Sequence, residues 1–323
     1  MLVNPLPYMA DLRKPLDDRP IRDKLPFKEC LTLVDADMFV YAAGFSVEHS
    51  EPIALDKWGN VMGQWRGKEQ YNKWCAKHPD LAKQVEELDF YDWREEFKQC
   101  EWILRRKRKQ IKDATRHSKQ RWFLTKGSTL WRNEDATIQK YKGNRDKMEK
   151  PYYYDDCRDF MCQEFGAKIC RGLEADDSVA QTARDNLGSV IIASGDKDLS
   201  TIPGYHLNIG KMKDGVYYVT PIEACRFLYG QMLTGDRIDN IRGLSGTREH
   251  PGWGPKTAAK AMAQFITEYD MAKFVAKQYE LKYPNGLIAE DGITHLEWHE
   301  VLTETANLLF LRRYQDVRFT WER

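Results

Sequence analysis

Runs of apolar residues in this chain alternate with longer segments in which apolar positions recur at helical spacing. Short aliphatic runs predict buried strands, and they occur at residues 31–34, 121–125, 167–170 and 189–193. Helical spacing predicts helices at residues 38–45, 96–119 and 152–165 and from residue 175 onward. This alternation is typical of helical crossovers between parallel strands. The pattern therefore predicts an α/β fold with a central, mostly parallel sheet and helices on both faces.

The pattern changes after residue 205. Short apolar runs at residues 206–209 and 216–219 predict two strands, and Pro221 opens a helix. The remainder of the chain is mostly helical in pattern. We predict an N-terminal extension over residues 1–28, an α/β domain over 29–205 and a mainly helical region over 206–323.

Acidic residues gather where three predicted strands end. They are Asp35 after residues 31–34, Glu174, Asp176 and Asp177 after 167–170, and Asp196 and Asp198 after 189–193. Sites in α/β sheets collect at the carboxyl ends of strands. Carboxylates crowded there lose their ionisation unless cations neutralise them, and oxygen ligands suit magnesium or manganese.

Ordinary structural roles compete with a metal site at these acids. Acidic residues in a first helical turn suit the helix dipole, and a Gly-Asp-Lys-Asp sequence suits a turn. Asp37 can be an N-cap, which leaves Asp35 as the better site candidate after the first strand. The two acidic motifs together, in this order and context, favour the metal site.

The composition describes a soluble globular chain, with 42% hydrophobic and 31% charged residues among 323. No run of apolar residues is long enough to span a membrane, and the N-terminus has no apolar signal core. The seven scattered cysteines form no Cys-x-x-Cys motif. We therefore expect reduced thiols in the cytoplasm, no structural zinc and no membrane partner.

Positive charge is concentrated in one segment. Residues 101–150 hold 16 Lys and Arg against 6 Asp and Glu, a local charge of +10 in a chain whose net charge is +1. A basic segment on an otherwise acidic chain suggests a polyanionic partner, although a solvated helix face has the same composition. Within it, Lys142 and Arg145 supply phosphate-binding charge, and the ring of Tyr141 offers a surface on which a base can stack.

Two further motifs follow in the C-terminal region. Asp236 and Asp239 are three residues apart, so their carboxylates can face the same way on a helical turn. Gly252 and Gly254 precede Pro255, which opens a predicted helix. The free N–H groups at such a helix start can bind a phosphate.

Taken in order, these motifs resemble the flap endonuclease superfamily. The matching segments are Val34-Asp35, Tyr141-Lys142-Gly143-Asn144-Arg145-Asp146, Glu174-Ala175-Asp176-Asp177, Gly195-Asp196-Lys197-Asp198, Gly235-Asp236-x-x-Asp239-Asn240 and Gly252-x-Gly254-Pro255-Lys256-Thr257-Ala258. The superfamily includes bacteriophage 5′→3′ exonucleases and the 5′-nuclease domain of bacterial DNA polymerase I. The chain looks most like the exonucleases of short-tailed bacteriophages.

The resemblance implies a PIN-like nuclease domain over residues 29–205 with a basic arch segment at about 96–150, and a helix-hairpin-helix motif in the DNA-binding region 206–323. It implies a metal-dependent 5′→3′ exodeoxyribonuclease, with flap endonuclease and RNA-primer-removing activity, in phage DNA replication or host DNA degradation. The expected partner is double-stranded DNA with a free or flapped 5′ end, or an RNA–DNA hybrid. The expected state is a monomer in the host cytoplasm.

The resemblance also assigns roles to single residues. Two Mg²⁺ ions, replaceable by Mn²⁺, are expected at Asp35, Glu174, Asp176, Asp177, Asp196, Asp198, Asp236 and Asp239, directly or through waters. Lys142 and Arg145 match the basic residues that grip the scissile phosphate. The expected DNA contacts are Tyr141, Lys142, Arg145, Gly252, Gly254, Lys256, Thr257 and Lys260, with K⁺ assisting at the hairpin.

The chain departs from the family pattern in two places. Thr125-Lys126-Gly127 stands where the family usually has another metal-binding aspartate, for which Glu134 or Asp135 could compensate. Residues Thr247–Pro251 form an insertion in the hairpin. Two other functions stay open, a PIN-type ribonuclease and a non-catalytic, structure-specific DNA-binding protein.

Overall fold

The computed structural model describes residues 2–3, 12–19, 29–116, 118–127, 131–145, 148–186, 188–244, 252–312 and 319–321. Most of the predicted N-terminal extension, Asp146 and the Thr247–Pro251 insertion lie outside the described residues. The chain divides into two compact units. One contains residues 1–37, 109–148 and 165–323, and the other contains residues 38–108 and 149–164.

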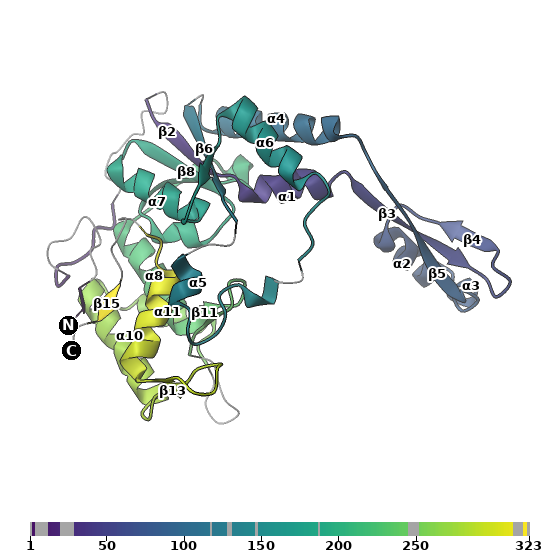
Figure 1. The fold of residues 1–323 in the computed structure, drawn as a ribbon. Helices are drawn as coiled ribbons and strands as arrows, with labels where there is room; N and C mark the ends of the chain where they lie inside the picture. Colours follow the sequence, from purple (N-terminus) through teal and green to yellow (C-terminus); the bar gives the residue numbers. More distant parts are fainter. Residues whose placement is uncertain are drawn as a thin grey trace. The chain divides into compact units, whose positions relative to one another are not determined.

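The larger unit is built on a six-stranded sheet with the strand order β10-β9-β8-β2-β6-β7, of which β2, β6 and β8 are labelled in Figure 1. Its strands are β2 (Leu31–Asp35), β6 (Lys119–Thr125), β7 (Lys168–Cys170), β8 (Val190–Ser194), β9 (Gly204–Asn208) and β10 (Val216–Val219). All neighbouring strands run parallel except β10, which pairs antiparallel with β9. The predicted α/β fold with a mostly parallel central sheet is confirmed.

Helix α7 (Ala175–Asp185) packs against β2, β6, β7 and β8 (Figure 1). Its buried side chains include Val179, Ala180 and Ala183, the positions that helical spacing predicted. The Ala175 backbone N–H donates to Thr125 Oγ1, at the last residue of β6, over 2.8 Å. This contact places the first turn of α7, and hence its acidic residues, at the carboxyl ends of the strands.

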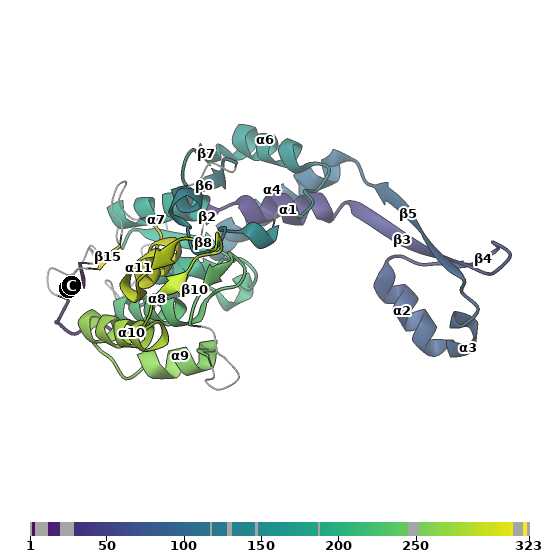
Figure 2. The same ribbon diagram turned by 60° about the horizontal axis from the view of Figure 1, so that its bottom comes forward.

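A second hydrophobic core joins the C-terminal helices, which lie together in Figure 2. The helices of this part are α5 (Trp131–Asp135), α8 (Pro221–Thr234), α9 (Pro255–Met262), α10 (Glu268–Lys282) and α11 (Trp298–Leu309). Short hairpins join them, formed by β11 (Gly235–Asp236) with β12 (Ile241–Arg242) and by β13 (Leu287–Ile288) with β14 (His295–Leu296). Near the N-terminus, Leu16 is buried in this core, and β1 (Leu2–Val3) pairs with β15 (Thr320–Trp321). Part of the predicted extension therefore packs on the helical region.

The smaller unit combines helices with a separate three-stranded antiparallel sheet of order β4-β3-β5. Its elements are α1 (Asp37–Phe45, from Met38 onward), β3 (Glu48–Leu55), β4 (Val61–Gln64), α2 (Lys68–Lys77), α3 (Pro79–Ala82), β5 (Glu87–Arg94), α4 (Phe97–Ala114, as far as Arg108) and α6 (Tyr154–Phe165, as far as Glu164). Arg105 on α4 pairs with Glu164 on α6 at 2.9 Å. Residues 46–95, in which apolar positions have no regular spacing along the sequence, thus contain all three strands of this sheet.

Two predicted boundaries need correction. The limit at residue 205 falls inside β9, so the central sheet extends to Val219. The predicted basic helix over 96–119 ends at Ala114, and residues from Lys119 belong to β6.

Helix α9 begins at Pro255 as predicted, but residues 245–251 are not described, so the helix-hairpin-helix motif stays a prediction. Among the described helices none has the length and apolar character needed to cross a membrane.

The β11–β12 hairpin depends on a close backbone approach at Gly235. This residue has φ 66° and ψ −171°, and a Cβ built on it would lie 2.3 Å from Gly243 N and 2.4 Å from the Ile241 carbonyl oxygen. We predict that Gly235→Ala lowers the free energy of unfolding by roughly 2–5 kcal/mol, because backbone strain and a steric clash add. Chemical denaturation monitored by circular dichroism measures this loss.

Gly215 provides a matched control, since it has nearly the same backbone angles, φ 79° and ψ −170°. A Cβ there meets no atom within 4 Å. Gly215→Ala should therefore cost only the strain, roughly 1–3 kcal/mol. Equal losses in the two variants would contradict the close approach of β11 and β12.

Candidate metal centre

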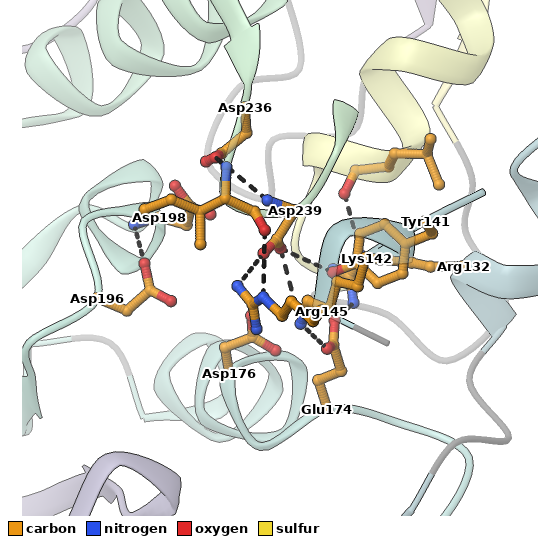
Figure 3. Close-up of polar contacts among 12 residues, drawn as sticks. Arg132, Tyr141, Lys142, Arg145, Glu174, Asp176, Asp196, Asp198, Asp236 and Asp239 are labelled. Atoms are coloured by element: carbon orange, nitrogen blue, oxygen red, sulfur yellow. Dashed lines mark hydrogen bonds and ion pairs between the residues drawn. The ribbon is translucent and has the colours of Figure 1, made fainter. Parts of the chain in front are cut away.

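Four segments of the larger unit carry the predicted acids, and Figure 3 shows the acids of three of them, Glu174 and Asp176, Asp196 and Asp198, and Asp236 and Asp239. Glu174, Asp176 and Asp177 at the start of α7 present carboxylate oxygens within 4.8 Å of one another. Asp35 ends β2, and the Ser194 hydroxyl at the end of β8 donates to it at 3.0 Å. Asp236 and Asp239 come from the β11–β12 hairpin and its turn. The structure therefore places these acids in the same unit, with the three at the start of α7 in one compact group, and their role as metal ligands stays a prediction.

The segment after β8 continues this arrangement. The Asp196 backbone N–H donates to Ser194 Oγ at 2.9 Å, and the Asp198 N–H donates to Asp196 Oδ1 at 2.9 Å. Lys197 pairs with both Asp198 and Asp236. These contacts link the strand-end acids to the acids of the β11–β12 hairpin.

The crowding of carboxylates changes their protonation. Burial, with Asp37 and Asp196 nearby, raises the pKa of Asp35 to about 7. Burial and the charges of Glu174 and Asp177 raise the pKa of Asp176 well above its usual value. Burial also raises the pKa values of Asp198 and Asp239. A bound cation would relieve this repulsion, so the electrostatics and the all-oxygen donor set both fit a divalent ion such as Mg²⁺ or Mn²⁺.

Asp177 lies in this cluster but faces a buried arginine that the sequence analysis did not assign. Arg132 on α5 donates to both Asp177 oxygens at 2.8 and 2.9 Å, and to Glu174 Oε2 at 2.6 Å. The Trp131 indole and the Arg312 backbone N–H also donate to Asp177, at 3.1 and 2.8 Å. Because fixed donors occupy both oxygens of Asp177, we infer that this carboxylate positions the cluster and does not itself contact a cation.

Arg132 is held from several sides. Only 1% of its surface is exposed, and it donates to the backbone carbonyls of Leu308 and Phe310 at 3.0 and 3.3 Å. Arg132 therefore connects the start of α7 to the end of α11. A single arginine after a tryptophan has no distinctive pattern along the chain, so only the tertiary contacts reveal its role.

The predicted role of Tyr141 needs correction. Its ring is buried, with 4% of the residue exposed, and therefore offers no free face for a base. Its hydroxyl lies 2.9 Å from both Glu174 Oε2 and Asp239 Oδ2. Tyr141 thus spans two of the acidic segments and is not placed for stacking on DNA.

Lys142 and Arg145 lie beside the acids (Figure 3). The Lys142 ammonium pairs with Glu174 and lies 3.7 Å from Asp239, while Arg145 pairs with Asp239 at 2.5 Å. Burial raises the pKa of Glu174, but the charges of Arg132 and Lys142 more than offset it, so the net pKa is lowered. Lys142 also has φ 53°, which is uncommon outside glycine. Such strained positions cluster at functional sites.

Neither Glu134 nor Asp135 is placed as a substitute for the missing aspartate. Glu134 is exposed on α5, and Asp135 lies near Glu304 and helps to raise its pKa. At the end of β6 the structure instead places Asp37. The Thr125 N–H donates to its two carboxylate oxygens at 3.0 and 3.1 Å.

The residues expected to contact duplex DNA lie on and before α9. Gly252 and Gly254 precede the helix, and Lys256, Thr257 and Lys260 are exposed on it. The helix packs against α8 and contributes Ala258 and Met262 to the C-terminal core. These residues therefore form a group of their own, supported by elements other than those of the acidic cluster.

Known proteins with this fold include bacteriophage enzymes. The chain aligns with a structure of T5 5′-exonuclease containing bound zinc, with a TM-score of 0.51 and 17% identity over 88% of this chain and 90% of that one. A T5 D15 flap endonuclease variant in complex with DNA and metal ions aligns with a TM-score of 0.50, 17% identity and the same coverage. This chain thus has the T5 5′-exonuclease fold, which confirms the predicted resemblance.

A comparison of sequences gives a consistent result over part of the chain. DNA polymerase I of Bacillus caldotenax is 32% identical over 154 residues, which is 44% of this chain and 17% of that protein. The curated relatives that match are all much longer, and the chain spans between 11% and 17% of their length. No protein-family model matches the chain.

We predict that Arg132→Met lowers the free energy of unfolding by about 3–5 kcal/mol, because Asp177 and Glu174 then remain as buried charges without their partner. Chemical denaturation in the presence of a chelator measures this. Lys109→Met is the control, since Lys109 forms only an exposed pair with Asp113 and should cost about 1 kcal/mol or less. An Arg132→Met loss as small as that of the control would contradict the structural role of Arg132.

The raised pKa of Asp35 predicts an unusual dependence of stability on pH. The folded state holds the Asp35 proton up to about pH 7, whereas the ordinary value for aspartate is 3.8. Between these values the folded state binds more protons, so the contribution of Asp35 to stability falls as the pH rises. In chelator, Asp35→Asn should therefore flatten the loss of thermal stability between about pH 4 and pH 7. A wild-type curve that Asp35→Asn leaves unchanged would contradict the burial of this carboxyl.

Proposed function

We propose that this protein is a divalent-metal-dependent 5′→3′ nuclease that hydrolyses phosphodiester bonds at DNA 5′ ends. The observation that supports it most is the convergence of acids from four segments at the carboxyl edge of the sheet. They converge in a fold shared with a 5′-exonuclease that binds divalent ions. Mg²⁺ is the proposed ion, and Mn²⁺ can replace it.

The proposed cation ligands are the acids that, unlike Asp177, are not bound through both oxygens by Arg132. They are Asp35, Glu174, Asp176, Asp196, Asp198, Asp236 and Asp239, with Asp177 as a positioning residue. Asp37 adds a carboxylate at the end of β6, where Thr125 holds it. When bound, two divalent ions activate water for attack on phosphorus and stabilise the charge on the departing 3′ oxygen.

Lys142 and Arg145 are the proposed contacts for the scissile phosphate. Both are partly exposed and already lie against Glu174 and Asp239. Cations bound by these acids would neutralise the carboxylates of Glu174 and Asp239. The Lys142 ammonium and the Arg145 guanidinium would then be available to a phosphate. Because they would face charge that grows as the P–O bond breaks, we expect them to stabilise the transition state more than the bound substrate.

The α9 group of Gly252, Gly254, Lys256, Thr257 and Lys260 is the proposed contact for the duplex backbone. Its exposed lysines and the helix start at Pro255 suit phosphates, and K⁺ is proposed to assist there. We further propose flap endonuclease activity, removal of RNA primers, action as a monomer and a role in phage DNA replication. These finer proposals rest on the motif order and on the bacteriophage origin of the T5 structures.

The proposal predicts that Asp176→Asn lowers turnover roughly 100-fold or more, because a cation ligand is lost, while DNA binding changes little. The measurement uses 5′-labelled duplex and flap DNA with Mg²⁺ or with chelator, and a filter-binding assay in parallel. Asp185→Asn, an exposed position on the same helix, is the matched control and should cleave normally.

Each other outcome of this experiment has a defined meaning. Unchanged cleavage by Asp176→Asn would refute the metal assignment. Release of nucleotides from the 3′ end would refute the polarity. Tight DNA binding without cleavage in any divalent ion would favour a non-catalytic DNA-binding protein, and cleavage of RNA alone would favour a PIN-type ribonuclease.

A further inference from the structure

Lys197 lies between two acids that come from different parts of the fold. Its ammonium is 2.8 Å from Asp198 Oδ1 and also pairs with Asp236 Oδ2. The Asp236 side chain is 3% exposed and the Asp198 side chain 16% exposed, whereas the Lys197 side chain is 51% exposed. A half-exposed lysine therefore neutralises two acids that are largely buried.

The remaining contacts of these acids fix them in place without supplying a second positive charge. Asp236 Oδ1 accepts the Ile238 N–H at 2.7 Å, within the turn after β11. The Gln231 amide on α8 donates to Asp198 Oδ1 at 2.6 Å. Both donors are neutral and belong to the fold itself. The two carboxylates thus keep their positions whichever cation lies between them.

Lys197 differs in how firmly it is held from Arg132, which also pairs with two acids of the cluster. Arg132 is buried and is tied to two backbone carbonyls as well as to its acids. Lys197 has a flexible four-carbon stem, and half of its side chain is already in solvent. Arg132 is a permanent part of the core, whereas Lys197 can leave by rotation of its own side chain.

We propose that Lys197 is an exchangeable counter-ion of the Asp198–Asp236 pair, and that a divalent cation displaces it on binding. The inference rests on the proposed function, because the displacing ion is the one assigned to this cluster. Displacement breaks no covalent bond. One ammonium group moves into solvent, and a divalent ion takes its place between the same two carboxylates.

The exchange has two physical consequences. In the absence of a divalent ion, the lysine offsets the repulsion between Asp198 and Asp236 and holds the β11–β12 hairpin against the segment after β8. Once displaced, the ammonium is no longer held by two carboxylates and lies in solvent. Metal binding thereby releases the Lys197 amine from both of its ion pairs.

Competitive acylation of lysines with an N-hydroxysuccinimide ester tests this directly, because an amine paired with two carboxylates is less available to the reagent than one in solvent. Lys197 should be protected in chelator, and its labelling rate, followed by peptide mass spectrometry, should rise severalfold in saturating Mn²⁺. Lys213, an exposed lysine on the 3₁₀ turn after β9, is the control and should react equally in both conditions. Asp236→Asn should label Lys197 rapidly even in chelator.

A second measurement uses Lys197→Met and calorimetric titration with Mn²⁺. Removal of the competing ammonium should tighten Mn²⁺ binding about fivefold, a change that corresponds to about 1 kcal/mol. Lys197→Arg keeps the charge and should bind Mn²⁺ no more tightly than the wild type. Lys213→Met should leave the affinity unchanged.

The outcomes separate this inference from the proposed function. If the wild type binds Mn²⁺ but Lys197 stays protected, or if Lys197→Met binds no more tightly, the counter-ion role is overturned and the nuclease proposal stands. If the wild type binds no Mn²⁺ at all, both proposals are overturned. Protection in chelator, release in Mn²⁺ and tighter binding by Lys197→Met together support the exchange.

Discussion

The repulsion among carboxylates at the carboxyl edge of the central sheet is the constraint on which the rest of this structure depends. Acids from β2, α7, the segment after β8 and the β11–β12 hairpin approach one another closely enough to raise several of their pKa values. Such crowding costs stability. The fold tolerates it because each acidic segment is anchored by contacts outside the cluster, such as the Ser194 hydroxyl for Asp35 and the Ile238 N–H for Asp236.

Four positively charged side chains of the described residues offset this repulsion, and they differ in how firmly the surrounding structure holds them. Arg132 is buried and fixed, so it sets the geometry of Glu174 and Asp177. Lys142, Arg145 and Lys197 are partly exposed and pair with acids proposed to bind cations. Sites of this kind trade stability for function. In this protein the hydrophobic cores under α7 and among α8, α10 and α11 border the acidic cluster and support it, with Ala175 in the first core and Tyr141 in the second.

Much of this arrangement could be predicted from the sequence, because the relevant signals are local. Buried strands are short aliphatic runs, and the acids Asp35, Asp196 and Asp198 directly follow two of them. What could not be predicted depends on tertiary contacts. The role of Arg132 arises from residues more than forty positions away in the chain, and the burial of the Tyr141 ring depends on the C-terminal core. The sheet of β3, β4 and β5 was missed because β4 and β5 bury no residue and β3 buries only Pro52 and Ala54, so the alternation of apolar and polar positions is too short to detect.

The most direct test of this account is anomalous X-ray diffraction from crystals of the protein grown with Mn²⁺. Strong anomalous peaks are expected about 2.2 Å from carboxylate oxygens of Asp176 and of the Asp198–Asp236 pair, near the distances typical of small divalent ions. No peak is expected in contact with Asp177, whose oxygens face Arg132. Saturating Mn²⁺ that leaves these carboxylates without an anomalous peak would contradict the central claim that the acids form a cation site.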